Sequence, residues 1–119
     1  DVIMSEINKA GRANFSKMIM ATRQLKTINR QINVNNLELS YLQQDKNFQL
    51  EDISNQLEKC EDEYGTDSTQ YKQMQEWATA EQNEIADDFE LSMQTLQEES
   101  KKLESEKEYY TSQTQSSHG

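Results

Sequence analysis

The chain has 119 residues, of which 33% are hydrophobic and 29% charged, with no proline, one cysteine and a net charge of −10. So little apolar material excludes a thick globular core, although it is enough to line a seam between helices. An acidic chain is a poor candidate for nucleic-acid binding, which needs clustered cations to displace the counterions of phosphates.

The sequence has no run of about 18 apolar residues, so no membrane span is expected. Lys9 and Arg12 interrupt any apolar core near the start, so no signal peptide is visible. The chain begins at Asp1 rather than methionine, which leaves a trimmed start open. The compartment is therefore unknown, and a cytoplasmic protein or one secreted by a route without a signal is expected.

Residues 1–20 are predicted to form an N-terminal helical arm. Gly11 weakens the helix at one point by roughly 1 kcal/mol. The densest apolar cluster of the chain follows it, and comprises Phe15, Met18, Ile19 and Met20. The rest of the chain offers the arm no partner, so we expect it to fold back or to bind another molecule.

Residues 21–64 are predicted to form the first helix of a hairpin. Apolar side chains recur in steps of three and four along one stripe, which is typical of a helix that faces a partner helix. This first seam comprises Met4, Ile7, Gly11, Asn14, Met18, Ala21, Leu25, Ile28, Ile32, Asn35, Leu39, Leu42, Lys46, Leu50, Ile53, Leu57, Cys60 and Tyr64. The two asparagines lower stability and fix the register. The spacing slips around Lys46, a stutter that relaxes the supercoil.

Residues 65–68 are predicted to form the turn of the hairpin. Gly65 suits the left-handed conformation just past a helix end. Asp67, Ser68 or Thr69 can cap the start of the next helix. The acidic side chains around the turn lack the spaced pattern of a calcium loop, so no metal site is expected there.

Residues 69–111 are predicted to form the second helix, and residues 112–119 a disordered polar tail. The second seam comprises Tyr71, Met74, Ala78, Glu81, Ile85, Phe89, Met93, Leu96, Ser100, Leu103, Lys107 and Tyr110. It also slips, around Phe89. If the chain folds about Thr66, paired positions sum to about 132, and the two stutters lie at about the same height.

The charges favour the same antiparallel pairing. Residues 1–60 hold 8 basic and 7 acidic side chains, whereas residues 61–119 hold 4 and 15. The pairing would place Arg23, Lys26 and Arg30 near Glu104, Glu106 and Glu108. The predicted fold class is therefore all-α: a long antiparallel two-helix coiled-coil hairpin with an N-terminal arm, completed by self-association or by a partner helix.

A second apolar stripe lies on the first helix, offset by about two positions from the first seam. It comprises Val34, Leu37, Tyr41 and Phe48, and Leu91 of the second helix should lie near Tyr41. Two helices alone cannot cover both stripes. The second stripe is predicted to dock a third helix or a second copy of the chain; the alternative is a broad seam with partly exposed aromatic rings.

The sequence favours binding over catalysis. His118 is the only histidine, and no Glu-x-x-His pair, phosphate loop, nucleophile elbow or zinc motif is present. No enzymatic activity, cofactor or small-molecule substrate is expected. The leading hypothesis is a structural or adaptor protein that binds a protein partner or itself. One alternative is a component or substrate of a bacterial secretion or filament apparatus. The other is a membrane-surface protein that uses the basic arm.

Overall fold

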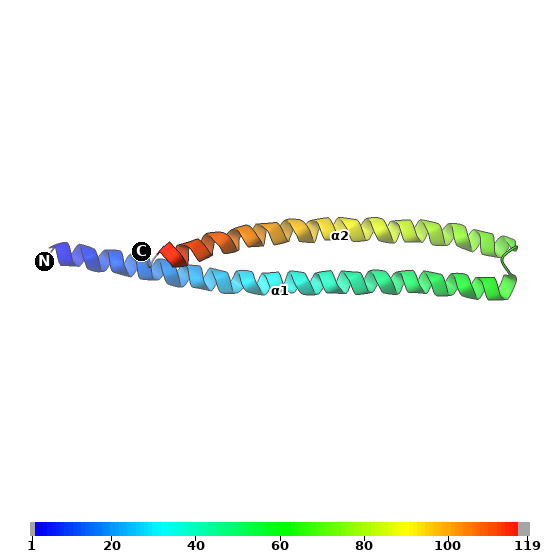
Figure 1. Ribbon diagram of the computed structural model, residues 1–119, viewed down its shortest axis with the longest axis horizontal. Helices are drawn as coiled ribbons and strands as arrows, with labels where there is room; N and C mark the ends of the chain where they lie inside the picture. Colours follow the sequence, from blue (N-terminus) through cyan, green and yellow to red (C-terminus); the bar gives the residue numbers. More distant parts are fainter. Residues whose placement is uncertain (1, 117–119) are drawn as a thin grey trace. The chain divides into compact units, whose positions relative to one another are not determined.

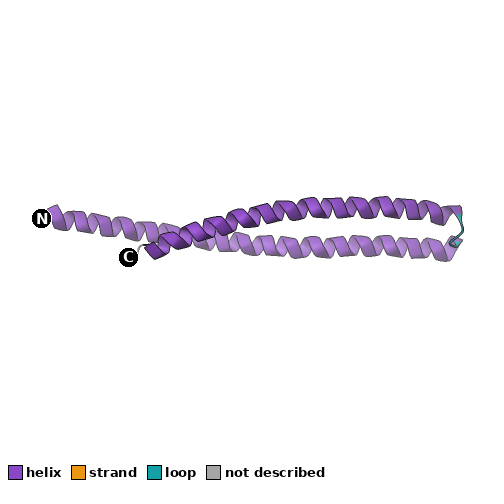
Figure 2. Ribbon diagram, turned by 45° about the horizontal axis from the view of Figure 1, so that its top comes forward, coloured by secondary structure: helices purple, strands orange, loops and turns teal. Residues whose placement is uncertain are grey.

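The computed structural model describes residues 2–116, which form two α-helices joined by a turn. Helix α1 spans Val2–Tyr64 and helix α2 spans Thr69–Ser116 (Figures 1 and 2). The predicted all-α helical hairpin is confirmed. The chain divides into two compact units. We call residues 37–97 the turn unit, and residues 1–36 with 98–119 the terminal unit.

The turn closes as the sequence predicts. Gly65 adopts a φ of 82°, which L side chains rarely adopt, and its N–H donates to the Glu61 carbonyl oxygen at 2.8 Å. Ser68 is the cap of α2, because its Oγ accepts a hydrogen bond from the Tyr71 N–H at 3.1 Å. The same hydroxyl donates to the Gly65 carbonyl oxygen at 2.7 Å. Asp67 is exposed and does not act as the cap.

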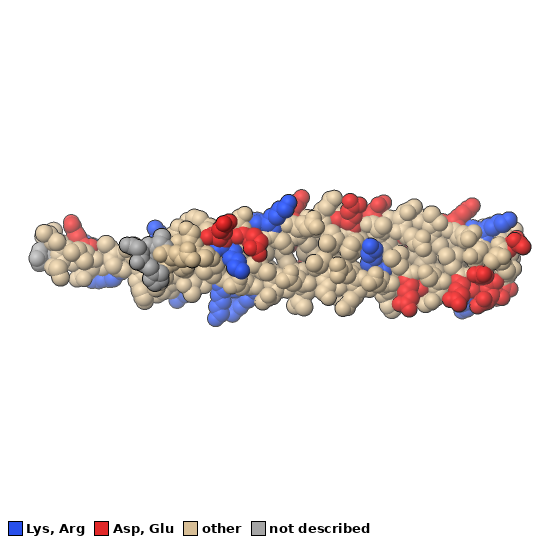
Figure 3. Space-filling view, in the orientation of Figure 1, with Lys and Arg blue, Asp and Glu red and all other residues tan. Residues whose placement is uncertain are grey.

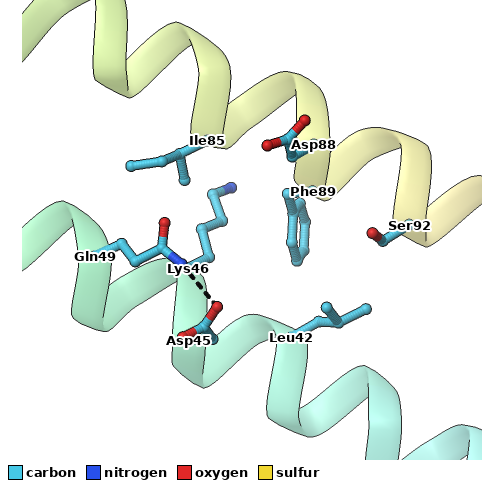
Figure 4. A pocket seen from close by; sticks show the side chains of 8 residues that line it. All are labelled: Leu42, Asp45, Lys46, Gln49, Ile85, Asp88, Phe89 and Ser92. Atoms are coloured by element: carbon cyan, nitrogen blue, oxygen red, sulfur yellow. Dashed lines mark hydrogen bonds between the residues drawn. The ribbon is translucent and has the colours of Figure 1, made fainter.

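The core of the turn unit follows both predicted seams. Ile53, Cys60, Ala78 and Leu96 are buried between α1 and α2. The two stutters meet, because the Nζ atom of Lys46 lies over the Phe89 ring (Figure 4). This contact confirms that the two helices change their repeat at the same height, as the antiparallel pairing requires.

The core of the terminal unit lies along the same seams. Ala21, Ile28 and Asn35 of α1 are buried, and Leu103 of α2 is half-buried. Ser100, which was assigned to the second seam, is exposed. A serine contributes little apolar area, so its exposure leaves the apolar core unchanged.

The prediction of a disordered tail from residue 112 is wrong as far as Ser116, because α2 continues to that residue. Thr111, Gln113 and Thr114 are half-buried, and the Thr114 Oγ1 donates to the Thr111 carbonyl oxygen at 2.7 Å. Packing within the terminal unit therefore extends the helix through residues that carry no apolar pattern. Residues 117–119, including His118, lie outside the described residues.

The predicted charge pairing in the terminal unit does not produce direct contacts. Arg23, Lys26 and Arg30 are exposed, and within residues 2–116 none of them forms an ion pair. Exposed pairs contribute only about 0.2–1 kcal/mol, too little to hold long side chains together. Proximity of opposite charges can favour this helix pairing without a fixed bridge.

Candidate protein-binding surfaces

The turn unit has an apolar surface on the side of α1 that faces away from α2. Leu37, Tyr41 and Phe48 are 71%, 70% and 72% exposed. Each residue advances about 100° around a helix, so Phe48, two residues from both Lys46 and Leu50, lies roughly opposite the seam. We call these three residues the outward face. Helix α1 thus carries apolar side chains on two opposite sides, and α2 covers only one of them.

A row of carboxylates follows one edge of the outward face. Glu38, Asp45 and Asp52 recur at seven-residue spacing and are exposed. The Nε2 atom of Gln49 donates to Asp45 Oδ2 at 2.8 Å, as Figure 4 shows, and that of Gln56 donates to Asp52 Oδ2 at 3.0 Å. These hydrogen bonds hold two carboxylates close to the helix surface while leaving them open to a cationic partner.

The whole turn unit is strongly acidic. Its residues carry 15 acidic and 3 basic side chains, a net charge of −12. Many of the acidic side chains visible in Figure 3 lie over the end of the hairpin that holds the turn. A cationic partner would therefore be attracted to this unit over a distance of about one Debye length.

Two further residues of the predicted second stripe are also accessible. Leu91 is exposed on α2 within the turn unit. Its proximity to Tyr41 stays a prediction. Val34, in the terminal unit, is partly exposed.

The N-terminal arm presents a second apolar surface. Residues 2–17 of α1 are exposed, and Met4, Ile7 and Phe15 expose 56%, 59% and 59% of their surface. Together with Gly11 these residues are spaced by three, four and four, so they share one side of the helix. We call Met4, Ile7, Gly11 and Phe15 the arm face. A Cβ added at Gly11 would meet nothing within 4 Å.

The predicted cluster in the arm divides between two environments. Phe15 and Met20 are exposed, whereas Met18 and Ile19 are half-buried in the terminal unit. Met18 and Ile19 are therefore part of the hairpin packing rather than of an open surface. Sequence reasoning placed Met4 and Ile7 on the first seam but did not name them as binding residues, although it found no partner for the arm within the chain. Both are exposed.

The groove between the helices at Lys46 offers little room for a ligand. Its volume is about 240 Å³, and it is open to solvent. The Lys46 side chain extends across it to Phe89 (Figure 4). Among residues 2–116, no three side chains of histidine, cysteine, aspartate or glutamate are grouped so that they could hold a metal ion.

Neither helix contains a stretch long and apolar enough to cross a bilayer within the described residues. Searches against protein-family models, curated proteins and solved structures found no match to this chain.

Proposed function

We propose that the chain is a non-enzymatic coiled-coil protein, structural or adaptor in role, that works by helix-to-helix protein binding and by self-association. The observation that carries this proposal is the outward face, where Leu37, Tyr41 and Phe48 are exposed although the seam on the other side of α1 is already filled. A helix with apolar side chains on two opposite sides is typical of a helix that packs between two neighbours.

Burial of the outward face would contribute favourably to the free energy of binding. Fully burying a leucine or phenylalanine side chain contributes about 1.5–3 kcal/mol. Binding must also offset the loss of rigid-body freedom, an unfavourable term of about 4–15 kcal/mol. The outward face alone therefore supports weak or transient binding, and a stable assembly requires further apolar surface, which the arm supplies.

Sedimentation equilibrium over a wide concentration range tests the proposal. The intact chain should reach masses above the 13.9 kDa of the monomer. A variant with Leu37→Gln, Tyr41→Gln and Phe48→Gln, which we call the outward-face variant, should associate at least about tenfold more weakly, because it loses apolar burial.

A matched control separates this effect from general damage to α1. Gln43→Ala with Asn47→Ala changes two exposed residues on another side of the same helix and should leave association unchanged. Circular dichroism should show equal helicity in all three proteins. An intact chain that sediments as a monomer at every concentration, up to the millimolar range, would refute self-association.

The arm supports a second candidate, binding to an anionic membrane surface. Arg12 and Lys17 are exposed on either side of an apolar helix face, the arrangement of interfacial amphipathic helices. The intact chain should then bind vesicles rich in phosphatidylserine, and Arg12→Glu with Lys17→Glu should abolish the binding. Vesicles that retain no protein would remove this candidate.

A place in a secretion or filament apparatus would instead be favoured if the purified chain formed ordered fibres.

A further inference from the structure

We infer that the partner of the outward face is the arm face of a second copy of this chain, packed against it in antiparallel orientation. The inference rests on the proposed function and specifies the partner. Both surfaces belong to the uninterrupted helix α1. The inferred contact joins two molecules.

The two surfaces match in length. Met4 to Phe15 and Leu37 to Phe48 each cover eleven residue steps, which is about 16 Å of α-helix. Each surface begins and ends with an exposed apolar side chain. One helix can therefore cover the other without leaving an apolar end uncovered.

The side chains also match in size when the helices run in opposite directions. Superposing Phe15 on Leu37 brings Gly11 opposite Tyr41 and Met4 opposite Phe48, because the same residue steps separate them on both surfaces. Each aromatic ring then meets a flexible or smaller side chain, and Ile7 lies level with Asp45 at the edge of the outward face. The parallel arrangement instead places Phe15 against Phe48 and leaves Gly11 opposite Gln44. The antiparallel register packs better.

Gly11 gives independent support for this register. A glycine inside a helix lowers stability by roughly 1 kcal/mol relative to alanine. Nothing in the described chain requires this glycine, since its surroundings are open space. A bulky ring such as that of Tyr41, received from another molecule, would make use of the missing side chain.

The charges complement one another along the same contact. Residues 7–36 carry six basic side chains and no acidic one, whereas the turn unit has a net charge of −12. Arg12 adjoins Gly11, and Glu38 adjoins Leu37, so the antiparallel register places both on the same edge of the contact. Within residues 2–116, Arg12 forms no ion pair that this contact would have to break.

Each contact joins the arm face of one copy to the outward face of another. The antiparallel register is reciprocal: where Phe15 of one copy lies level with Leu37 of the second, Leu37 of the first lies level with Phe15 of the second. Two copies that make both contacts with each other form a closed pair, and copies that make them with different neighbours form a ring or an open filament.

A mixing experiment tests the pairing of unlike surfaces. The arm variant carries Met4→Gln, Ile7→Gln and Phe15→Gln, all exposed positions, and the outward-face variant is the one defined above. Each variant alone should sediment as a monomer. An equimolar mixture should form a species of twice the monomer mass, because one intact arm face meets one intact outward face.

Other results would overturn the inference in distinguishable ways. If the outward-face variant alone still associates, the arms pair with each other; if the arm variant alone still associates, the outward faces pair. Either result refutes the inference and leaves the proposed self-association standing. An intact chain that is always a monomer refutes both.

Gly11→Ala separates an effect on association from an effect on the stability of the helix. Alanine favours the helix, so the thermal unfolding midpoint of the monomer should stay equal or rise. Association should nevertheless weaken about tenfold or more, because the added methyl group meets the ring of Tyr41. Ala13→Gln, on the opposite side of the arm, should leave association unchanged. Unchanged association in Gly11→Ala would refute the antiparallel register.

Discussion

The Nζ atom of Lys46 lies 4.4 Å from the centre of the Phe89 ring, across the seam of the turn unit. Both residues are half-buried, and each is the middle residue of a four-plus-four slip in its own helix. A cation over an aromatic face gains about 0.5–2 kcal/mol, with the larger values in desolvated sites. The Phe89 ring thus stabilises the positive charge of a lysine that lies in an apolar seam.

Removal of either partner should reveal this coupling. Lys46→Met keeps the length of the side chain without its charge, and Phe89→Leu keeps an apolar group without the ring. Urea unfolding of both single variants and the double variant should give a coupling free energy of about 0.5–1 kcal/mol. A coupling indistinguishable from zero would mean that the lysine contributes only the packing of its stem.

Asn35 should be replaceable with a gain in stability. It is only 7% exposed, and its Nδ2 has no hydrogen-bond partner. A buried donor left unsatisfied costs about 1–3 kcal/mol, so Asn35→Leu should raise the free energy of unfolding by a similar amount. Asn33→Leu, at an exposed position two residues away, is the control and should change stability by less than about 0.5 kcal/mol. A loss of stability in Asn35→Leu would show that the amide finds a partner in solution.

The gain in stability from Asn35→Leu should be accompanied by a less specific register of the two helices. A polar residue in a seam disfavours other registers, because a shifted register places the amide against apolar side chains. The Asn35→Leu variant should therefore show broader amide resonances or a second set of peaks in NMR spectra. A single sharp set would indicate that the stutters and the turn fix the register without the asparagine.

Ser68→Ala should lower the free energy of unfolding by about 1 kcal/mol, because the Tyr71 N–H loses its acceptor at the start of α2. Asp67→Ala is the matched control, since the Asp67 side chain is exposed and does not cap the helix. Equal effects in urea unfolding would show that Asp67 exchanges with Ser68 as the cap.

The two described glycines should respond oppositely to alanine. Gly65 has a φ of 82°, a strained conformation for any side chain, so Gly65→Ala should destabilise the hairpin by about 1–2 kcal/mol. Gly11→Ala removes a flexible residue from a helix in open space and should raise local helix stability by up to about 1 kcal/mol. Hydrogen exchange of the flanking amides measures both effects. Destabilisation of the arm by Gly11→Ala would contradict the helical conformation described for it.

The helical hairpin could be predicted because the apolar spacing and the turn residues of this sequence indicate the same fold. Apolar spacing predicted the buried Ile28 and Ile53, and Gly65 with Ser68 predicted the turn. The end of α2 could not be predicted, since Thr111 and Gln113 carry no apolar signal although both are helical and half-buried. The lack of a hydrogen-bond partner for the Asn35 amide could not be predicted either. It depends on the side-chain conformation and on the neighbouring residues, which the apolar spacing does not determine.

The candidate surfaces were predictable in part. The two-residue offset of Tyr41 and Phe48 from the seam places them on the far side of α1 by helix geometry alone. The boundary of the arm was harder, because it depends on where α2 ends. Met18 and Ile19 are covered for this reason, while Phe15 remains exposed.

The separation of the seam and the outward face on opposite sides of α1 has an evolutionary consequence. Substitutions at Leu37, Tyr41 or Phe48 do not disturb the packing that holds the hairpin together, because none of these side chains is buried in it. Natural selection can therefore change these three side chains without first compensating for lost stability. Substitutions on the side of α1 that faces α2 do not have this freedom, because they disturb buried packing.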